Sequence, residues 1–285
     1  MQDKIIDGKK CAEELKNNLK KEINAFKTKP GLVDIQIGDN EASNIYIKSK
    51  KRQAEEIGIN FYHIKFDDGV EENIIIDKIK ELNNDSDING ILIQLPLPSG
   101  YDEKKLINYI APEKDVDGLT EANTGKLFLN KNSLISCTPN GVIKLLKENN
   151  IEISGKNVVI IGRSNLVGKP LIHLFLKENA TVTVCHTKTK NIESHTRCAD
   201  ILVVACGSPK FIKNNMIKDG VVIIDVGINR VDGKISGDVD FDDVYNKTSK
   251  ITKVPGGVGP MTVAMLLYNT VISYKRMNGY DKYEQ

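Results

Sequence analysis

Short apolar runs alternate with amphipathic segments along most of this chain, and that alternation is what most constrains its fold. In the first half, the spacing of apolar residues predicts helix 9–26, strand 32–37, helix 42–57, strand 60–66, helix 71–83 and strand 90–95. Strands separated by helices have the crossover connections that parallel pairing needs. The first half is therefore expected to form a mainly parallel sheet with helices on its faces.

The same order returns after Gly141. A helix through residues 145–146 precedes strand 157–161, helix 168–178 and strands 181–185, 201–205 and 221–226. Apolar strands at this spacing predict a doubly wound, nucleotide-binding sheet. A chain of 285 residues also exceeds the roughly 250 at which a single core stops growing. The expected fold class is therefore α/β with two domains.

The segment between the two blocks, residues 112–139, is richer in Asn, Thr, Lys and Gly, and its apolar residues follow neither a helical nor a strand period over any length. We expect it to connect the domains. The last helix, 261–277, carries apolar residues along one face, so it must pack on one of them.

Composition excludes several classes of function. The 40 basic and 38 acidic side chains leave a net charge of +2, which argues against nucleic-acid binding and against a membrane-surface protein. No apolar run approaches the ~20 residues of a transmembrane helix, and the first residues contain no signal-peptide core, so a cytoplasmic protein is expected.

The cysteines predict neither disulfides nor a metal site. They number five and include no Cys-x-x-Cys pair, which is typical of reduced thiols. The four histidines do not cluster with them at metal-ligand spacing. Cys185 stands next to His186, but we interpret it as a strand-core residue and expect no metal.

A glycine-rich turn follows strand 157–161. It begins Gly162-Arg163-Ser164 and ends at Gly168, at a strand-to-helix junction where backbone N–H groups and the helix dipole bind pyrophosphate. The outer glycines are one residue further apart than in Gly-x-Gly-x-x-Gly, and Ser164 replaces the second glycine. The motif alone fits either a nucleotide site or a plain turn.

The end of the next strand indicates which nucleotide would bind. NAD-specific sites place a carboxylate there to hold the ribose 2′-OH, whereas this chain has His186, Thr187 and Lys188. With Arg163, these hydroxyl and basic groups favour a 2′-phosphate and hence NADP. The alternative is that Lys188 and Lys190 belong only to a solvated turn.

Tyr46 and Lys50 are four residues apart, so on a helix they share one face. They are either a catalytic pair or a surface lysine whose stem covers an aromatic ring. Gln94 lies at the carboxyl end of an apolar strand, the edge where open α/β sheets bind ligands. The alternative is that the Gln94 side chain only caps the end of the strand by hydrogen bonds to the backbone.

Two loops are further candidates. Asp117 belongs to Asp115-Val116-Asp117-Gly118, which is either a binding loop or an Asp-Gly turn. Residues 255–260, Pro-Gly-Gly-Val-Gly-Pro, precede the last helix. This loop either lets the backbone approach a ligand closely or forms a tight structural turn.

Five segments, in this order, closely resemble the bifunctional methylenetetrahydrofolate dehydrogenase/methenyltetrahydrofolate cyclohydrolase family. They are residues 46–50, 90–98, 112–118, 162–170 and 255–262. The resemblance implies a folate-binding catalytic domain (1–139, joined by the C-terminal helix 261–285), an NADP-binding Rossmann-type domain (140–260), a cleft between them and a homodimer. It also implies oxidation of 5,10-methylenetetrahydrofolate with NADP and hydrolysis of the methenyl product to 10-formyltetrahydrofolate.

The family's roles carry over to matching positions. The resemblance implies that Lys50 is the catalytic lysine, that Tyr46 stacks on the folate, that Gln94 bonds the lysine and that Asp117 holds the pterin. The other positions it implies are Leu95, Gly259, Pro260 and Thr262 for substrate, and Gly162, Arg163, Ser164, Thr187 and Ile228 for NADP. At Thr187 a serine is also common in the family, so the hydroxyl is retained and a methyl is added.

Two other classes of function remain open on the residues alone. One is another two-domain NADP dehydrogenase, of the shikimate or amino-acid type, which has no use for Lys50, Gln94 and Asp117 together. The other is a dinucleotide-sensing module without turnover, which is favoured if Lys50 and Asp117 do not share a site.

Overall fold

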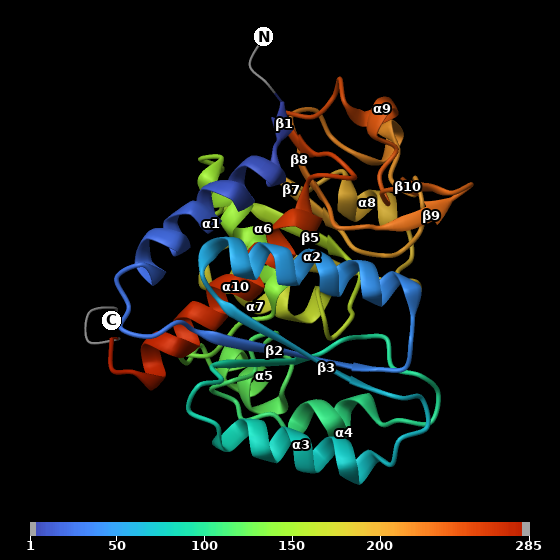
Figure 1. Ribbon diagram of the computed structural model, residues 1–285. Coiled ribbons are helices and arrows are strands. Elements are labelled where there is room, and N and C mark those ends of the chain that lie inside the picture. Colours follow the sequence, from blue (N-terminus) through green and yellow to red (C-terminus); the bar gives the residue numbers. More distant parts are fainter. Residues whose placement is uncertain (1–3, 281–285) are drawn as a thin grey trace. The chain divides into compact units, whose positions relative to one another are not determined.

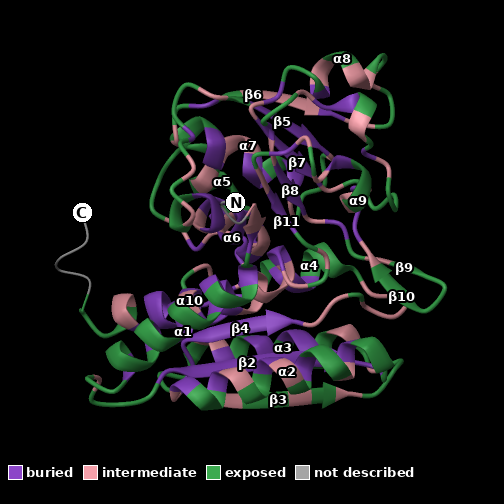
Figure 2. Ribbon diagram, turned by 90° about the horizontal axis from the view of Figure 1, so that it is seen from above, coloured by how far each residue is buried: buried purple, intermediate pink, exposed green. Residues whose placement is uncertain are grey.

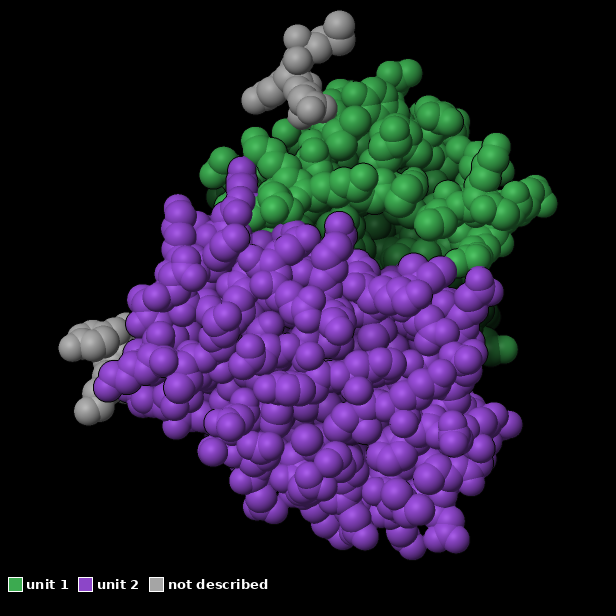
Figure 3. Space-filling view, in the orientation of Figure 1, with its two compact units in different colours: residues 1–13, 138–265 green, residues 14–137, 266–285 purple. Residues whose placement is uncertain are grey.

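The computed structural model describes residues 4–280, and its chain divides into two compact units (Figure 1). Unit 1 combines the residues up to Glu13 with Thr138–Met265, and unit 2 combines residues from Glu14 to Cys137 with those from Leu266 onward. Figure 3 shows the two units in different colours. No described helix is long and apolar enough to cross a bilayer.

Unit 2 is built on a three-stranded sheet in the order β3-β2-β4, with both pairs parallel. The strands are β2 (Gly31–Ile37), β3 (Asn60–Phe66) and β4 (Gly90–Ile93). Helix α2 (Glu41–Ile57) covers one face, while α3 (Glu72–Asn84) and α4 (Glu103–Asn108) cover the other (Figure 1). This arrangement confirms the parallel sheet expected for the first half of the chain.

The two faces of β2 differ in chemistry. Val33, Ile35 and Ile37 pack into a core with isoleucines of α3 and with Leu106 of α4. Because side chains alternate along a strand, Leu32, Asp34 and Gln36 point to the opposite face, the side of α2. All seven residues of β2 are buried. A charged side chain therefore lies in the interior of the central strand.

Helix α2 has well-defined ends, which fix the positions of its side chains. The Asn40 side chain accepts a hydrogen bond from the Ser43 N–H at the first turn, and Gly58 ends the helix in the left-handed conformation with φ 98°. Both are ordinary capping devices.

The segment expected to be an irregular connection contains α5 (Glu121–Phe128), capped by the Thr120 side chain. Only Asn123 is buried in this helix, so it has no apolar face and gives no helical period. Apolar periodicity finds helices that bury a face, and this one does not.

Unit 1 contains a six-stranded parallel sheet in the order β1-β11-β8-β7-β5-β6. The strands are β1 (Ile5–Ile6), β5 (Asn157–Ile161), β6 (Thr181–Cys185), β7 (Ile201–Val204), β8 (Val222–Asp225) and β11 (Lys250–Thr252). Figure 2 shows the central strands as buried. From β5 the chain runs outward to β6 and then returns to β7 on the other side, so β5 borders the topological switch point.

Shorter elements complete unit 1. They are α6 (Cys137–Glu148), α7 (Gly168–Lys177), α8 (Ile192–Thr196), a 3₁₀ turn (Asn214–Met216) and α9 (Phe241–Val244). An antiparallel hairpin joins β9 (Asn229–Val231) to β10 (Lys234–Ser236). Its turn, Asp232-Gly233, has positive φ at both residues. Asp-Gly is a sequence signal for such a hairpin, although the expected elements did not include one.

The observed units differ from the expected domain boundaries. Strand β1 pairs with β11, with Ile5 opposite Ile251, so the residues up to Glu13 belong to unit 1 and not with residues 14–137. Helix α1 (Gly8–Ile23) and helix α10 (Val258–Met277) each contribute to both units. Strands of two and three residues are too short to give an alternating pattern, which explains why β1 and β11 were not predicted.

Candidate active site

Lys50 is the centre of a buried polar cluster in unit 2. It lies on α2 and is only 6% exposed. Its Nζ donates a hydrogen bond to Gln94 Oε1 at 2.7 Å. Gln94 follows β4, and its side-chain Nε2 donates to Leu95 O at 2.5 Å, which turns its oxygen toward the lysine. Gln94 therefore both bonds the backbone and orients Lys50.

Tyr46 lies one turn before Lys50 on α2 and is 52% exposed. The lysine is buried and the tyrosine is not, so Lys50 is not a surface residue whose stem covers the ring. The exposed ring is free to offer a flat face to a planar molecule.

The structure adds Asp34 to this cluster. Its carboxylate on β2 is 0% exposed, and Lys50 Nζ lies 2.5 Å from Asp34 Oδ2. Burial raises the pKa of Asp34 above its ordinary value, and the positive charge of Lys50 opposes that rise. Sequence reasoning missed this residue because one polar side chain does not interrupt the pattern of an apolar strand.

Asp117 and Asp115 are two residues apart and have different surroundings. The Asp115 carboxylate accepts hydrogen bonds from the Leu119 and Thr120 N–H groups, the Thr120 hydroxyl and the Asn123 amide, so it stabilises the loop. Asp117 has a pKa raised to about 6 by burial and by the charge of Asp115, while the Lys50 charge opposes the rise. Lys50 and Asp117 thus lie within electrostatic reach of each other.

The loop around Asp117 is held by residues that sequence reasoning did not single out. Asn269 of α10 donates to Val116 O and to Ile135 O, both at 2.8 Å. Cys137 Sγ lies 3.4 Å from Val116 O, and burial together with the Asp117 charge raises the pKa of its thiol. A Cβ at Gly118 would lie 2.5 Å from the Ile135 backbone, and Gly118 has φ 68°. No signal in the sequence joins Asn269 to a loop about 150 residues before it.

In unit 1, the glycine turn after β5 is as tight as its sequence suggests. A Cβ on Gly162 would lie 2.2 Å from Ala205 O, and Gly162 has φ 123°. A Cβ on Gly168 would lie 2.3 Å from Gly162 O. Ser164 Oγ accepts from the Val167 N–H at 3.1 Å, so it stabilises the turn that leads into α7. The turn places backbone N–H groups at a helix N-terminus beside the switch point.

Arg163 and Thr187 follow β5 and β6, respectively, and both residues are exposed. Within residues 4–280, Arg163 makes no ion pair. Beyond β6 the turn is closed by the Thr189 N–H donating to His186 O at 2.8 Å. The carboxyl ends of two neighbouring strands thus carry an available cation and a hydroxyl.

Four more predicted positions lie after the carboxyl end of β8 and at the start of α10, also in unit 1. Ile228 is 55% exposed, and its Cδ1 lies 3.9 Å from where a Cβ of Gly259 would be. Pro260 is half-buried, and Thr262 Oγ1 lies 2.9 Å from Thr138 Oγ1. The structure therefore groups Gly259, Pro260 and Thr262 with the predicted cofactor residues, and Leu95 with Lys50 and Gln94.

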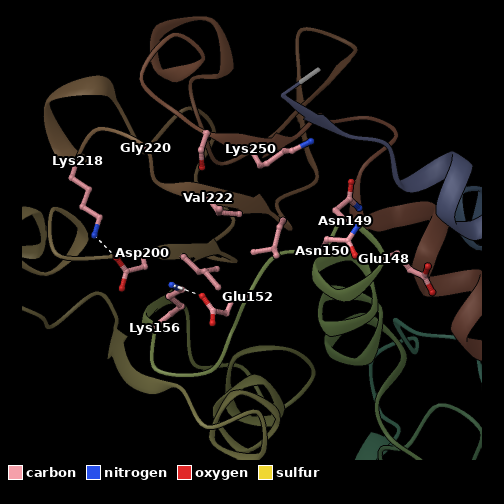
Figure 4. A pocket seen from close by; sticks show the side chains of 13 residues that line it. Glu148, Asn149, Asn150, Glu152, Lys156, Asp200, Lys218, Gly220, Val222 and Lys250 are labelled. Carbon is pink, nitrogen blue, oxygen red and sulfur yellow. Dashed lines mark hydrogen bonds and ion pairs between the residues drawn. The ribbon is translucent and has the colours of Figure 1, made fainter. Parts of the chain in front are cut away.

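A cavity of about 720 Å³ lies elsewhere in unit 1 (Figure 4). It is lined by residues at the amino ends of β5, β7, β8 and β11, including Lys156, Asp200 and Lys250. Lys218 pairs with Asp200, and Lys156 pairs with Glu152. Ligands of open α/β sheets bind at the carboxyl ends of the strands, so this cavity is not the nucleotide site. No group of three or more His, Cys, Asp or Glu side chains within the described residues is arranged to hold a metal.

Comparisons with known proteins agree with this arrangement. The family model of the tetrahydrofolate dehydrogenase/cyclohydrolase catalytic domain matches residues 6–117, and that of its NAD(P)-binding domain matches residues 136–278. The chain is similar to the bifunctional protein FolD of Bacillus subtilis, at 51% identity over 95% of this chain and 98% of the relative.

Solved structures give the same result. A crystal structure of the bifunctional enzyme FolD from Campylobacter jejuni is similar with a TM-score of 0.94 and 45% identity, covering 95% of this chain and 98% of that one. A Trypanosoma brucei methylenetetrahydrofolate dehydrogenase-cyclohydrolase, solved with NADP cofactor and an inhibitor, is similar with a TM-score of 0.90 and 35% identity. The match covers 95% of this chain and 97% of that one. The chain belongs to the tetrahydrofolate dehydrogenase/cyclohydrolase family.

Proposed function

We propose that this chain performs both reactions of its family, with its hydrolytic chemistry centred on Lys50. It oxidises 5,10-methylenetetrahydrofolate to the methenyl cation with NADP and hydrolyses that cation to 10-formyltetrahydrofolate. The observation that carries the proposal is the buried Lys50 ammonium, which contacts Gln94 Oε1 at 2.7 Å and Asp34 Oδ2 at 2.5 Å, with Asp117 in electrostatic reach.

The residues of unit 1 fit a dinucleotide with a 2′-phosphate. Gly162 and Gly168 lack Cβ atoms where the backbone must pass closely, and α7 begins at this turn. Residues 186–190, which follow β6, include no carboxylate, while Arg163 offers a cation and Thr187 a hydroxyl. When bound, NADP supplies the hydride acceptor. We propose Gly162, Arg163, Ser164, Thr187 and Ile228 as its contacts.

The oxidative step requires alignment more than acid–base chemistry. Hydride leaves a carbon flanked by two nitrogens, so the cation that forms is stabilised by the substrate itself. Asp117 can accept two hydrogen bonds from adjacent N–H donors of the reduced pterin, which fixes its orientation. Tyr46 offers an aromatic face for stacking. We propose that Leu95, Gly259, Pro260 and Thr262 complete the substrate contacts.

The hydrolytic step requires proton transfers. Water adds to the methenyl carbon and loses a proton. As the ring C–N bond then breaks, the added hydroxyl loses its proton to form the formyl C=O and the ring nitrogen takes up a proton, so the net reaction releases one proton. We assign the transfers to Lys50, because its amine group is buried and its position is fixed by Gln94.

We propose two further properties, a homodimer and a cytoplasmic location. The resemblance supports the first, and the reduced-thiol cysteine pattern supports the second. Light scattering tests the homodimer, because the measured mass should then be twice the chain mass of 31.7 kDa. Cell fractionation tests the location.

A spectroscopic assay tests the proposed reactions. The purified protein is mixed with 5,10-methylenetetrahydrofolate and NADP, and the absorbance of NADPH and of the methenyl band is followed while 10-formyltetrahydrofolate is quantified. We expect NADPH and the formyl product to form in equal amounts. Absence of NADPH formation would overturn the dehydrogenase, and methenyltetrahydrofolate as the only folate product would overturn the cyclohydrolase.

A further inference from the structure

We propose that Asp34 is a positioning residue for the hydrolytic step, which acts by fixing the Lys50 amine group and stabilising its ammonium form. The inference rests on the proposed function of Lys50. Asp34 lies in the middle of β2, the central strand of its sheet. Nothing in the packing of that strand requires a carboxylate, because its neighbours Val33 and Ile35 are apolar core residues.

Comparison with other buried aspartates of the chain shows how unusual Asp34 is. Asp115 accepts four hydrogen bonds. Asp225 accepts from the N–H groups of Gly227, Asp238 and Val239. Neither oxygen of Asp34 accepts a hydrogen bond of ordinary geometry from any described residue. Its compensation is the charge of Lys50, 2.5 Å away.

Such a pair is a poor way to stabilise a fold. Removing two charges from water costs several kcal/mol per ion, and apolar replacements of buried pairs are often neutral or stabilising. The donors that stabilise Asp115 and Asp225 are absent around Asp34 among the residues that the structure describes. A buried carboxylate that contributes little to the fold is therefore better explained by its effect on Lys50.

The geometry specifies that effect. An ammonium group has three N–H donors. One is directed to Gln94 Oε1 at 2.7 Å, and a second is attracted to Asp34 Oδ2 at 2.5 Å. Two fixed acceptors on different segments leave a single N–H, or after proton loss a single lone pair, for the substrate. Lys50 is thereby aimed without any direct contact between Asp34 and the folate.

Charged groups reach Asp34 from three elements. They are Lys50 on α2, His63 on β3 and Asp117 on the loop after β4. His63 is in register with Asp34 across the β2–β3 pair and is held by a hydrogen bond of 2.9 Å between its Nε2 and Gln36 Oε1. Lys50 has the largest opposing effect on the charge state of Asp34.

The step that benefits is the one that makes Lys50 positive. When water adds to the methenyl carbon, its proton passes to the lysine nitrogen. A negative charge beside that nitrogen stabilises the ammonium so formed. The oxidative step moves no proton through Lys50, so Asp34 should affect hydrolysis selectively.

The test compares Asp34→Asn with Asp39→Asn. Asp39 is another aspartate near α2, but its partners are Lys65 and Asn44 at the surface. Both variants remove one negative charge without changing shape. An opposite charge within a few ångströms shifts proton equilibria by about one to three pH units. We expect Asp34→Asn to lower the kcat of the cyclohydrolase at least about tenfold on this basis, with the dehydrogenase changed less than about threefold.

The pH profile provides a readout that a structural role would not move. Lys50 accepts the proton as the neutral amine, which is lost on the acid limb of the cyclohydrolase pH profile. Without the carboxylate the ammonium form is less favoured, so this acid limb should move to lower pH in Asp34→Asn. Asp39→Asn should keep both the wild-type profile and the wild-type ratio of activities. If Asp34→Asn does not fold, Asp34→Val, which suits a central strand, carries the same expectation.

A double variant shows whether Asp34 acts through Lys50. In the Lys50→Met background, Asp34→Asn should leave the residual hydrolysis unchanged, because the group it acts on is gone. An equal fold-loss in both backgrounds, or an unchanged activity ratio and pH profile in the single variant, overturns the inference. Failure of the proposed function is seen separately, as a wild-type protein that lacks one of the two reactions.

Discussion

Lys50 and Gln94 are 44 residues apart in sequence, and their side chains meet in a 2.7 Å hydrogen bond. The bond joins helix α2 to the end of strand β4. The amide nitrogen of Gln94 donates to Leu95 O, so its oxygen cannot turn away without loss of that contact. The lysine is thus held by a group whose own orientation is fixed.

The first prediction concerns the cofactor. Arg163→Ala should raise the KM for NADP more than the KM for NAD, because only NADP carries the 2′-phosphate that the guanidinium would bind. Steady-state kinetics with both cofactors measures this. Lys177→Ala, at the other end of α7, is the matched loss of charge and should change neither constant. Equal increases for both cofactors in Arg163→Ala would remove the 2′-phosphate role.

Asp117→Asn keeps the side-chain shape and replaces one acceptor oxygen by a donor that faces the pterin's own donors. We expect folate binding to weaken by roughly 1–3 kcal/mol, the range for mispaired polar groups. NADP affinity should be unchanged, because the proposed cofactor contacts lie in unit 1. Calorimetric titration with each ligand measures both. A folate affinity equal to that of the wild type would show that Asp117 does not hold the pterin.

Folate affinity should also depend on pH. The pKa of Asp117 is raised to about 6, mainly by burial, and only the ionised carboxylate accepts two hydrogen bonds. Binding should therefore be at its strongest well above this pKa and weaken as the pH falls through about 6. The same titration at several pH values tests this. Asp117→Asn, which has no proton to gain, should lose the pH dependence in this range; a wild-type affinity that stays flat as the pH crosses that pKa would contradict the assignment.

Gly162→Ala should destabilise unit 1. The added Cβ would lie 2.2 Å from Ala205 O in a backbone with φ 123°, and strained backbone of this kind costs about 1–3 kcal/mol before the clash is counted. Gly125→Ala is the control, because nothing lies within 4 Å of its Cβ position and it is exposed in α5. That change should be neutral or stabilising by up to about 1 kcal/mol. Denaturant unfolding compares the two, and equal stabilities would show that the turn tolerates a side chain.

Elements with a long repeating pattern could be predicted from the sequence. The expected strands 60–66, 157–161 and 181–185 have the observed bounds of β3, β5 and β6. Each of these strands has at least five residues, so its strand pattern extends over enough of the sequence to be recognised. Strands β1 and β11 have two and three residues and exist because each pairs with a neighbour. Their stability comes from tertiary contacts, which no local pattern records.

In the candidate site, too, some residues could be predicted from a local sequence pattern and others only from tertiary contacts. Gln94 could be singled out because it is a polar residue at the end of an apolar strand, and Lys50 because of its spacing from Tyr46. Asp34 could not, since its importance arises from a partner on another element that packs over it. Asn269 reaches the Asp117 loop from α10, and only the folded chain brings them together.

The central claim is that Lys50 carries the proton transfers of hydrolysis and is dispensable for hydride transfer. Lys50→Met keeps the apolar stem and removes the ammonium group. General acid–base assistance is worth about 10²–10⁴-fold, so the cyclohydrolase should fall by that order while the dehydrogenase is retained. Because the variant leaves Asp34 buried without its cation, circular dichroism must first show that it is folded, and Lys50→Met with Asp34→Asn provides a charge-balanced companion.

The decisive measurement is a time course of NADPH and of the methenyl band after Lys50→Met is mixed with 5,10-methylenetetrahydrofolate and NADP. The wild type should form NADPH with little methenyl absorbance, since the cation is hydrolysed as it is made. The variant should form NADPH together with an equal amount of methenyltetrahydrofolate that persists. Conversion of that methenyl group to the formyl product at the wild-type rate, in a folded Lys50→Met protein, would contradict the role of Lys50 described here.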